Sequence, residues 1–171
     1  ALNYTTTGGC NTATGTTALW QNTIGCHNTA HGYNALRINT TGAFNTAVGS
    51  SAMYSNTTGV NNTAVGYNTL FTNTTGANNT AVGHTALFCN TTGIQNIAQG
   101  YQSLWYNTTG KYNTAVGNMA LYSNVGGLDN SAVGYLALCA NTTASYNTAS
   151  GPYSLRANTT GDHNSAFGIS T

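Results

Sequence analysis

The sequence is a tandem array of one 17-residue repeat, and this period limits the fold more than any other feature. The word Asn-Thr-Ala-Val-Gly at residues 62–66 returns at residues 79–83. Its first Asn, which we number place 1 of the repeat, recurs without insertion or deletion at Asn11, Asn28, Asn45, Asn62, Asn79, Asn96, Asn113, Asn130, Asn147 and Asn164. Places 3 and 5 are Ala and Gly in all ten copies, and place 9 is Leu in eight of nine. We therefore interpret residues 1–171 as a single repeat array whose units begin at these ten positions.

This period predicts an all-β fold, a parallel β-solenoid (β-helix or β-roll) with one repeat per coil and about ten coils. Helical repeat families have units of about 33 to 47 residues, and regularly placed Gly with abundant Thr opposes a helix. Stacked strands lie about 4.8 Å apart, so ten coils would form a rod of about 50 Å. The chain begins and ends inside a unit, and we expect it to be a segment of a longer fibre.

The repeated word also predicts which side chains face the interior. Alternation in a strand directs places 1 and 3 (Asn and Ala) inward and places 2 and 4 (mostly Thr and Val) outward. Gly at place 5 would turn a corner with a positive φ, and Leu at place 9 would fill the interior. An inward Asn that meets its own copy in each coil predicts a structural ladder of hydrogen-bonded amides at place 1.

Place 10 follows the Leu and is predicted to point outward. It forms a candidate inter-chain apolar column, made of Trp20, Tyr54, Phe71, Phe88, Trp105 and Tyr122. With the Val residues of place 4, this column would expose more apolar surface than a monomer normally does. The rings either cover the chain's own core or are buried between chains, in a homo-oligomer (a parallel trimer is favoured) or an end-to-end filament. Rows of rings also suit sugars, so a carbohydrate or a cell-surface receptor is another candidate partner.

Place 12 is Asn in all nine full copies, and seven of these Asn begin an N-glycosylation sequon. The candidate glycosylation sites are Asn39, Asn56, Asn73, Asn90, Asn107, Asn141 and Asn158, and further sequons begin at Asn3, Asn61 and Asn78. The alternative is a structural role, because Asn22 and Asn124 remain Asn although Ile24 and Gly126 remove their sequons. A glycan and a buried ladder exclude each other at one residue.

The composition argues against several classes of function. Charged residues make up 3% of the chain, against about 25% in typical soluble proteins. The three basic residues lie far apart, which argues against a nucleic-acid partner, and no apolar run approaches the ~20 residues that insert into a membrane. Asp129 and Asp162 lie two coils apart, so no carboxylate pair is available, and the four His show no metal-ligand spacing. We expect no enzyme activity, no metal and no cofactor.

The four cysteines leave the redox compartment open. Cys10 and Cys26 lie at neighbouring places of adjacent coils, so a disulfide between them is geometrically possible. Cys89 and Cys139 are about three coils apart, roughly 14 Å by strand spacing, which is too far for a bond within one chain.

The pattern N-T/S-A-V-G-x-x-A-L, whose first five residues occur at residues 45–49, 62–66, 79–83, 113–117 and 130–134, resembles the head and stalk repeats of trimeric autotransporter adhesins. It is also similar to bacterial and phage tail-fibre-like β-solenoid repeats. The resemblance implies a trimeric, left-handed β-roll, located outside the cell, at the cell surface or on a virion, that binds host or matrix. Adhesin head repeats usually have a shorter period than this chain, so its coil would have an extra corner or a longer side.

Some ice-binding proteins are also β-rolls rich in Asn, Thr and Gly, with flat Thr ladders. Place 2 is Thr in seven of ten copies, but place 4, its neighbour on the same face, is mostly Val. The sequence thus predicts a structural segment of an extracellular or surface fibre, with or without glycans and without catalysis. The alternatives are an ice-binding β-solenoid and the shaft of a bacteriophage tail fibre.

Overall fold

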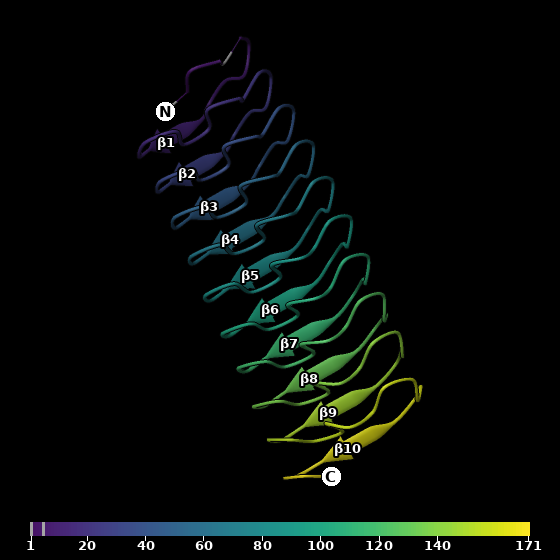
Figure 1. Cartoon of the computed structure of the whole chain (residues 1–171). Coiled ribbons are helices and arrows are strands. Elements are labelled where there is room, and N and C mark those ends of the chain that lie inside the picture. The colour runs from purple at the N-terminus through teal and green to yellow at the C-terminus, as the bar shows by residue number, and fades with distance from the viewer. Residues whose placement is uncertain (1, 5) are drawn as a thin grey trace.

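The computed structural model describes residues 2–4 and 6–171 and shows a rod of stacked coils (Figure 1). Each repeat contributes one three-residue strand, and no helix occurs among the described residues. The strands are β1 (Thr12–Thr14), β2 (Thr29–His31), β3 (Thr46–Val48), β4 (Thr63–Val65), β5 (Thr80–Val82), β6 (Ile97–Gln99), β7 (Thr114–Val116), β8 (Ser131–Val133), β9 (Thr148–Ser150) and β10 (Ser165–Phe167). They form one parallel sheet in sequence order, which confirms the predicted parallel β-solenoid with one repeat per coil.

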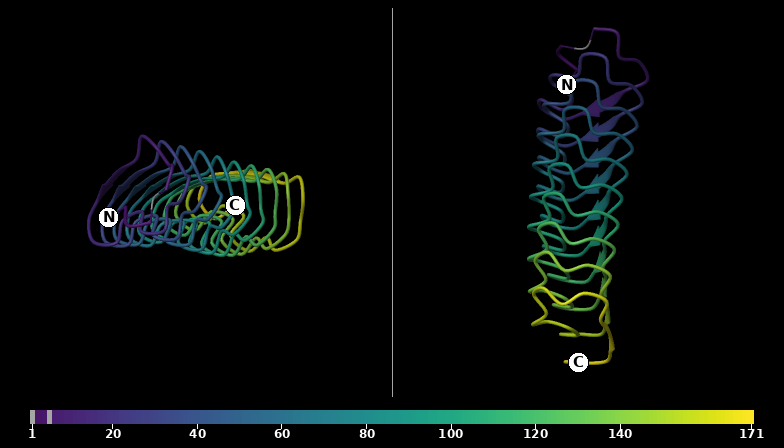
Figure 2. Two further views of the ribbon diagram at one scale, coloured as in Figure 1. Left: turned by 90° about the horizontal axis from the view of Figure 1, so that it is seen from above. Right: turned by 90° about the vertical axis from the view of Figure 1, so that its right-hand side faces the viewer.

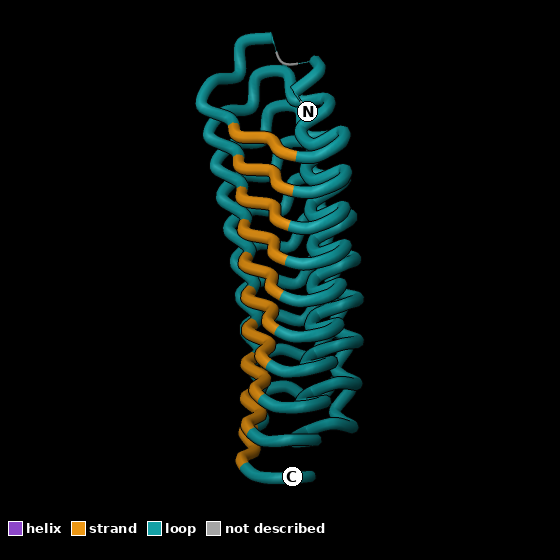
Figure 3. Tube along the Cα trace, turned by 90° about the vertical axis from the view of Figure 1, so that its left-hand side faces the viewer, coloured by secondary structure: helices purple, strands orange, loops and turns teal. Residues whose placement is uncertain are grey.

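The coils stack along a single axis, with the two ends of the chain at opposite ends of the rod (Figure 2). All ten strands lie along one side, and turns make up the rest of each coil (Figure 3). Each place pairs with its own copy, so that Ala64 of β4 is the partner of Ala81 of β5. At about 4.8 Å per strand, the rod is about 48 Å long.

Side chains alternate along the strands as predicted. In β5, Thr80 and Val82 are exposed while Ala81 between them is buried. The Ala residues of place 3 are fully or almost fully buried from Ala30 to Ala149. These Ala side chains pack in one buried cluster with the residues of place 9.

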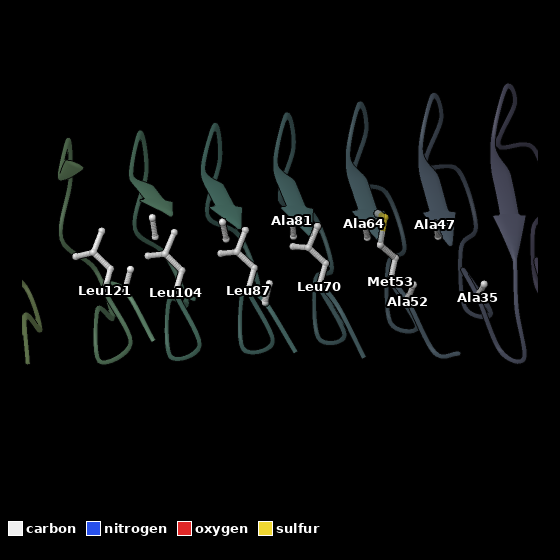
Figure 4. Packing of buried hydrophobic residues seen from close by; sticks show 14 of the residues in the cluster. Ala35, Ala47, Ala52, Met53, Ala64, Leu70, Ala81, Leu87, Leu104 and Leu121 are labelled. Carbon is white, nitrogen blue, oxygen red and sulfur yellow. The ribbon is translucent and has the colours of Figure 1, made fainter. Parts of the chain in front are cut away.

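The main apolar filler is the column of place 9. Its members Leu19, Leu36, Met53, Leu70, Leu87, Leu104, Leu121 and Leu138 are completely buried. Figure 4 shows Leu70, Leu87, Leu104 and Leu121 in a line, one per coil. Place 8, just before the Leu, is buried as well, as at Ala86. The sequence did not predict two consecutive inward residues, and the positive φ of the Leu (51° at Leu87) explains them because it breaks the alternation of the strand.

Leu87→Ala should lower the free energy of unfolding by about 3 kcal/mol, the usual cost of a cavity in a core that cannot collapse. Denaturant titration followed by circular dichroism measures this loss. Leu155→Ala is the matched control, because Leu155 packs against the core from the last full turn and is only partly buried. Equal losses at the two positions would contradict a core built from one continuous Leu column.

Gly serves two different purposes at the two corners. At place 5 the φ is positive in every coil, between 120° and 138°, as predicted. At place 15 the Gly residues do not have this φ, and they are needed for space instead. A Cβ on Gly76 would lie 2.3 Å from Oδ1 of Asn73 and 2.6 Å from the carbonyl oxygen of Gly93.

Three further places in each coil have a positive φ without being Gly. They are places 7, 9 and 17, represented in one region by Asn68 (50°), Leu70 (51°) and Asn78 (58°). The left-handed conformation costs an ordinary L-residue about 1–2 kcal/mol. The repeat keeps this conformation because it closes the coil and turns the Leu inward, so packing outweighs local strain.

Gln95→Gly should therefore stabilise the protein by roughly 0.5–1 kcal/mol, because it relieves a left-handed strain of about 1–2 kcal/mol and costs about 0.5–1 kcal/mol in chain entropy. Gln95 is exposed at place 17 with a φ of 55°, and Gly adopts this conformation without steric cost. The control is Gln99→Gly four residues later, at the exposed end of β6, where Gly should destabilise by about 1 kcal/mol through lost strand propensity. Thermal unfolding of the two variants should shift in opposite directions, and a shift of both in one direction would contradict this account.

Candidate functional site

The interior of the rod contains the predicted Asn ladder at place 1. Nδ2 of Asn79 donates to Oδ1 of Asn62 (3.1 Å) and to the carbonyl oxygen of Gly93 (2.9 Å). Oδ1 of Asn79 accepts from the backbone N–H (3.0 Å) and Nδ2 (3.1 Å) of Asn96. The same bonds between amides link all ten Asn, and the residues from Asn28 to Asn147 are buried. The predicted ladder is confirmed.

A second Asn ladder runs along place 12. Nδ2 of Asn90 donates to Oδ1 of Asn73 (2.7 Å) and to the carbonyl oxygen of Gly93 (3.2 Å). That carbonyl oxygen also accepts from Asn79, so it joins the two ladders in each coil. The signal for this ladder was present in the sequence, because Asn22 and Asn124 keep the amide without a sequon.

The second ladder bears directly on glycosylation. Of the seven candidate sites, Asn158 near the end of the array is half-buried. The other six are fully buried: Asn39, Asn56, Asn73, Asn90, Asn107 and Asn141. Nδ2, the atom that would carry a sugar, donates two hydrogen bonds inside the coil, as in Asn39 to Asn22 (2.7 Å) and to Gly42 (2.9 Å). The folded coil therefore leaves no room for a glycan at these buried amides.

The other sequons lie in different surroundings. Asn61 and Asn78 are exposed at place 17. The sequon that begins at Asn3 includes Thr5, which lies outside the described residues.

The candidate inter-chain column at place 10 forms a stack of rings along the rod. Tyr54 and Phe71 have ring centroids 5.1 Å apart, Phe71 and Phe88 5.2 Å, and Phe88 and Trp105 4.7 Å, with planes within 12° of parallel. Tyr122 continues the stack at 6.3 Å from Trp105. All five are half-buried, and each ring covers the face of the next. This stacking favours rings that cover the chain's own core, and it leaves few free faces on which a sugar could stack.

Trp20, the sixth member, lies outside this stack because Arg37 occupies the coil between. The Arg37 guanidinium lies over the Tyr54 ring, 5.5 Å from its centroid, and covers the first ring of the stack. Trp20 instead meets the ring of Tyr4 edge-on at 5.8 Å. At the other end, burial and, secondarily, a hydrogen bond with Tyr106 raise the pKa of the Tyr122 hydroxyl.

Two further ring columns lie on either side of the strands, and the sequence analysis missed both. At place 6, Tyr33, Tyr67, Tyr101 and Tyr135 are exposed in every second coil, and His84 lies between Tyr67 (5.1 Å) and Tyr101 (5.5 Å). At place 17, His27 stacks on Phe44 (4.9 Å) and Tyr146 stacks on His163 (4.8 Å). The available signal was the return of Tyr at place 6 in every second repeat.

The four cysteines, all within the described part of the chain, have free thiols. Burial raises the pKa of the Cys89 and Cys139 thiols, and Arg156 partly offsets this at Cys139. A raised pKa leaves less thiolate at a given pH.

We expect iodoacetamide to modify the exposed Cys10 first. Cys89 and Cys139 should react slowly, and their rates of modification should rise at higher pH. Peptide mapping over time measures the order, and faster labelling of Cys139 than of Cys10 would contradict it.

No metal-binding arrangement is evident in the described residues, where no three His, Cys, Asp or Glu side chains come together. Of the two acids, Asp162 accepts a hydrogen bond at Oδ1 from the backbone N–H of Ser145 (2.7 Å) in the coil before it. Within the same described residues, no helix is long and apolar enough to span a membrane.

The rod closes its core within one chain. Its solvent-accessible surface is 6965 Å², whereas that of a compact monomer of 17.6 kDa is about 7,900 Å².

No protein-family model matches the chain, and searches of curated proteins and of solved structures found no match.

Proposed function

We propose that this array is a structural segment of an extracellular or surface fibre, with no catalytic activity. The observation that carries the proposal is the continuity of its hydrogen bonds. Both Asn ladders and the backbone bonds between coils run from coil to coil along the rod. Every coil is supported by its neighbours in the same way, as expected of an element that extends a fibre.

The resemblance to adhesin heads and phage tail-fibre-like repeats supports placement at a cell surface or on a virion. Such a segment would extend the fibre and display its outer columns to a receptor, a carbohydrate or another copy of the chain. The low charge supports this proposal as well, because the chain has no surface suited to nucleic acid or to anionic lipid.

Small-angle X-ray scattering tests the proposed shape. A single chain should give a maximum dimension of about 50 Å and a much narrower cross-section, by the strand spacing. Negative-stain electron microscopy of the native material should show thin rods or fibres. A compact, nearly spherical shape for the monomeric chain would contradict a fibre segment.

Ice binding is the second candidate, and the outward face of the sheet favours it to a limited degree. This face carries in-register Thr and Val columns, as in Thr63 and Val65 next to Thr80 and Val82. The pattern is interrupted at β6, where Ile97 and Gln99 replace both residues, and it resumes at β7 with Thr114 and Val116. A run of three coils, β3 to β5, is only about 15 Å long. Absence of thermal hysteresis at millimolar protein would exclude this function.

A further inference from the structure

The two ring columns that flank the strands are complementary in size. A residue of place 17 and the residue of place 6 six positions later lie at the two ends of one strand. In eight of the ten coils a ring occurs at one of these ends and not at the other. Phe44 is followed by Ser50 and Tyr112 by Asn118, whereas Asn78 is followed by His84.

This complementarity cannot come from contact within the chain. A three-residue strand, about 10 Å long, and a turn at each of its ends separate the two columns. None of the ring–ring contacts among the described residues joins one column to the other; Phe44, for example, stacks on His27 in its own column. Ring contacts within one chain therefore do not explain the complementarity.

The structure also contains an example of how the edges could fit. His84 fills the coil between Tyr67 and Tyr101 and lies within 5.5 Å of both rings. At two other coils, place 6 carries a smaller side chain between two Tyr. Ser50 lies between Tyr33 and Tyr67, and Asn118 lies between Tyr101 and Tyr135. We call the positions of Ser50 and Asn118, which interrupt the ring column of place 6, slots, and we call the exposed Phe44 (58%) and Tyr112 (47%) knobs.

We propose that a second copy of this chain, parallel and level with the first, inserts its two knobs into these two slots. The inference rests on the proposed function as a fibre segment and adds the surface through which its chains associate. The completed edge would be a ladder of rings from both chains, like the stack that Tyr54, Phe71, Phe88 and Trp105 form within one chain.

The spacing along the chain supports this register. The two knobs lie four coils apart, and the two slots are separated by the same number of coils. Parallel, level chains therefore engage both pairs at once. Two coils near the start of the array depart from the pattern, because His27 and Tyr33 place rings at both ends of one strand, whereas Cys10 and Thr16 place none.

The size of the edge is also sufficient. A strip about 48 Å long and about 15 Å wide, the reach of four or five extended residues, covers roughly 700 Å². Stable interfaces bury about 800 Å² per partner. Since each chain offers one knob edge and one slot edge, the contact can close into a ring of chains.

Sedimentation velocity of three proteins tests the proposal. The wild-type chain should sediment as a multiple of 17.6 kDa. Variant A carries Ser50→Phe and Asn118→Tyr, which fill the slots, and variant B carries Phe44→Ser and Tyr112→Asn, which remove the knobs. Each variant alone should sediment as a monomer, whereas an equal mixture of A and B should associate, because knobs of A then meet open slots of B.

Circular dichroism and scattering on the same samples show whether each variant remains a folded rod, so failure of association is distinguishable from failure of the fibre proposal. Tyr106→Ala removes an exposed ring from place 11 and should leave association unchanged. A monomeric wild type would overturn the proposal. So would variants that still associate alone, or a mixture of A and B that stays monomeric.

Discussion

Asn79→Ala is expected to lower the free energy of unfolding by about 4 kcal/mol, because several buried polar groups lose their partners at once. The backbone N–H and one Nδ2 hydrogen of Asn96 would lose their acceptor, and Asn62 and Gly93 would each lose a donor. A buried polar group left without its partner costs about 1–3 kcal/mol. Urea unfolding followed by circular dichroism measures the loss.

Two further variants separate the ladder from side-chain volume. Asn164→Ala, in the last coil, removes an amide with only one ladder neighbour and should cost about 1 kcal/mol. Asn79→Asp keeps the shape but replaces a donor by an acceptor, and it should be at least as costly as Ala. A cost at Asn164 equal to that at Asn79 would show that the ladder is not cooperative.

Gly83→Ala is the second large effect, with an expected loss of at least about 3 kcal/mol or no folding at all. The φ of Gly83 is 132°, where a Cβ is strained. The added Cβ would lie 2.6 Å from the carbonyl oxygen and 2.8 Å from the carbonyl carbon of Gly100. Both atoms belong to the backbone of the next coil, so relief requires the coils to separate.

Gly76→Ala at place 15 is the matched comparison. Its φ is not positive, and the repeat itself carries Ala144 at this place. The carbonyl oxygen of Ala144 still accepts from both ladders, from Asn130 at 2.8 Å and from Asn141 at 3.0 Å. We expect a smaller loss than at Gly83 and a retained fold. If Gly76→Ala proves the more damaging of the two in thermal unfolding, the assigned roles of the two Gly places are wrong.

The fold could be predicted because each residue of a repeat lies next to the residue at the same place in the adjacent repeats. Ala64 had to meet Ala81, and an inward Asn had to meet another Asn, so burial and hydrogen bonding followed from place alone. The positive φ of Leu70 could not be predicted in this way. It is set by closure of the whole coil, which overrides the local preference of Leu.

The surface was harder to predict than the core. Place 10 stood out because it follows the Leu, yet the rings of Phe71 and Phe88 stack on each other. The columns of places 6 and 17 mix rings with small residues, so neither stands out as a repeated word. Their significance depends on their lying at opposite ends of one strand, which becomes visible only when both are placed on the rod.

The bonds between coils also affect how the chain reaches this structure. They connect residues about one repeat apart, as Asn79 to Asn96, and this separation is similar at every point of the rod. Over the whole chain it corresponds to a relative contact order of roughly 0.1, a value typical of fast-folding helical bundles. An extra coil lengthens the rod without adding any more distant pairing. The array can therefore assemble from one end while the remainder of the polypeptide is still being synthesised, and its folding rate need not fall as its length grows.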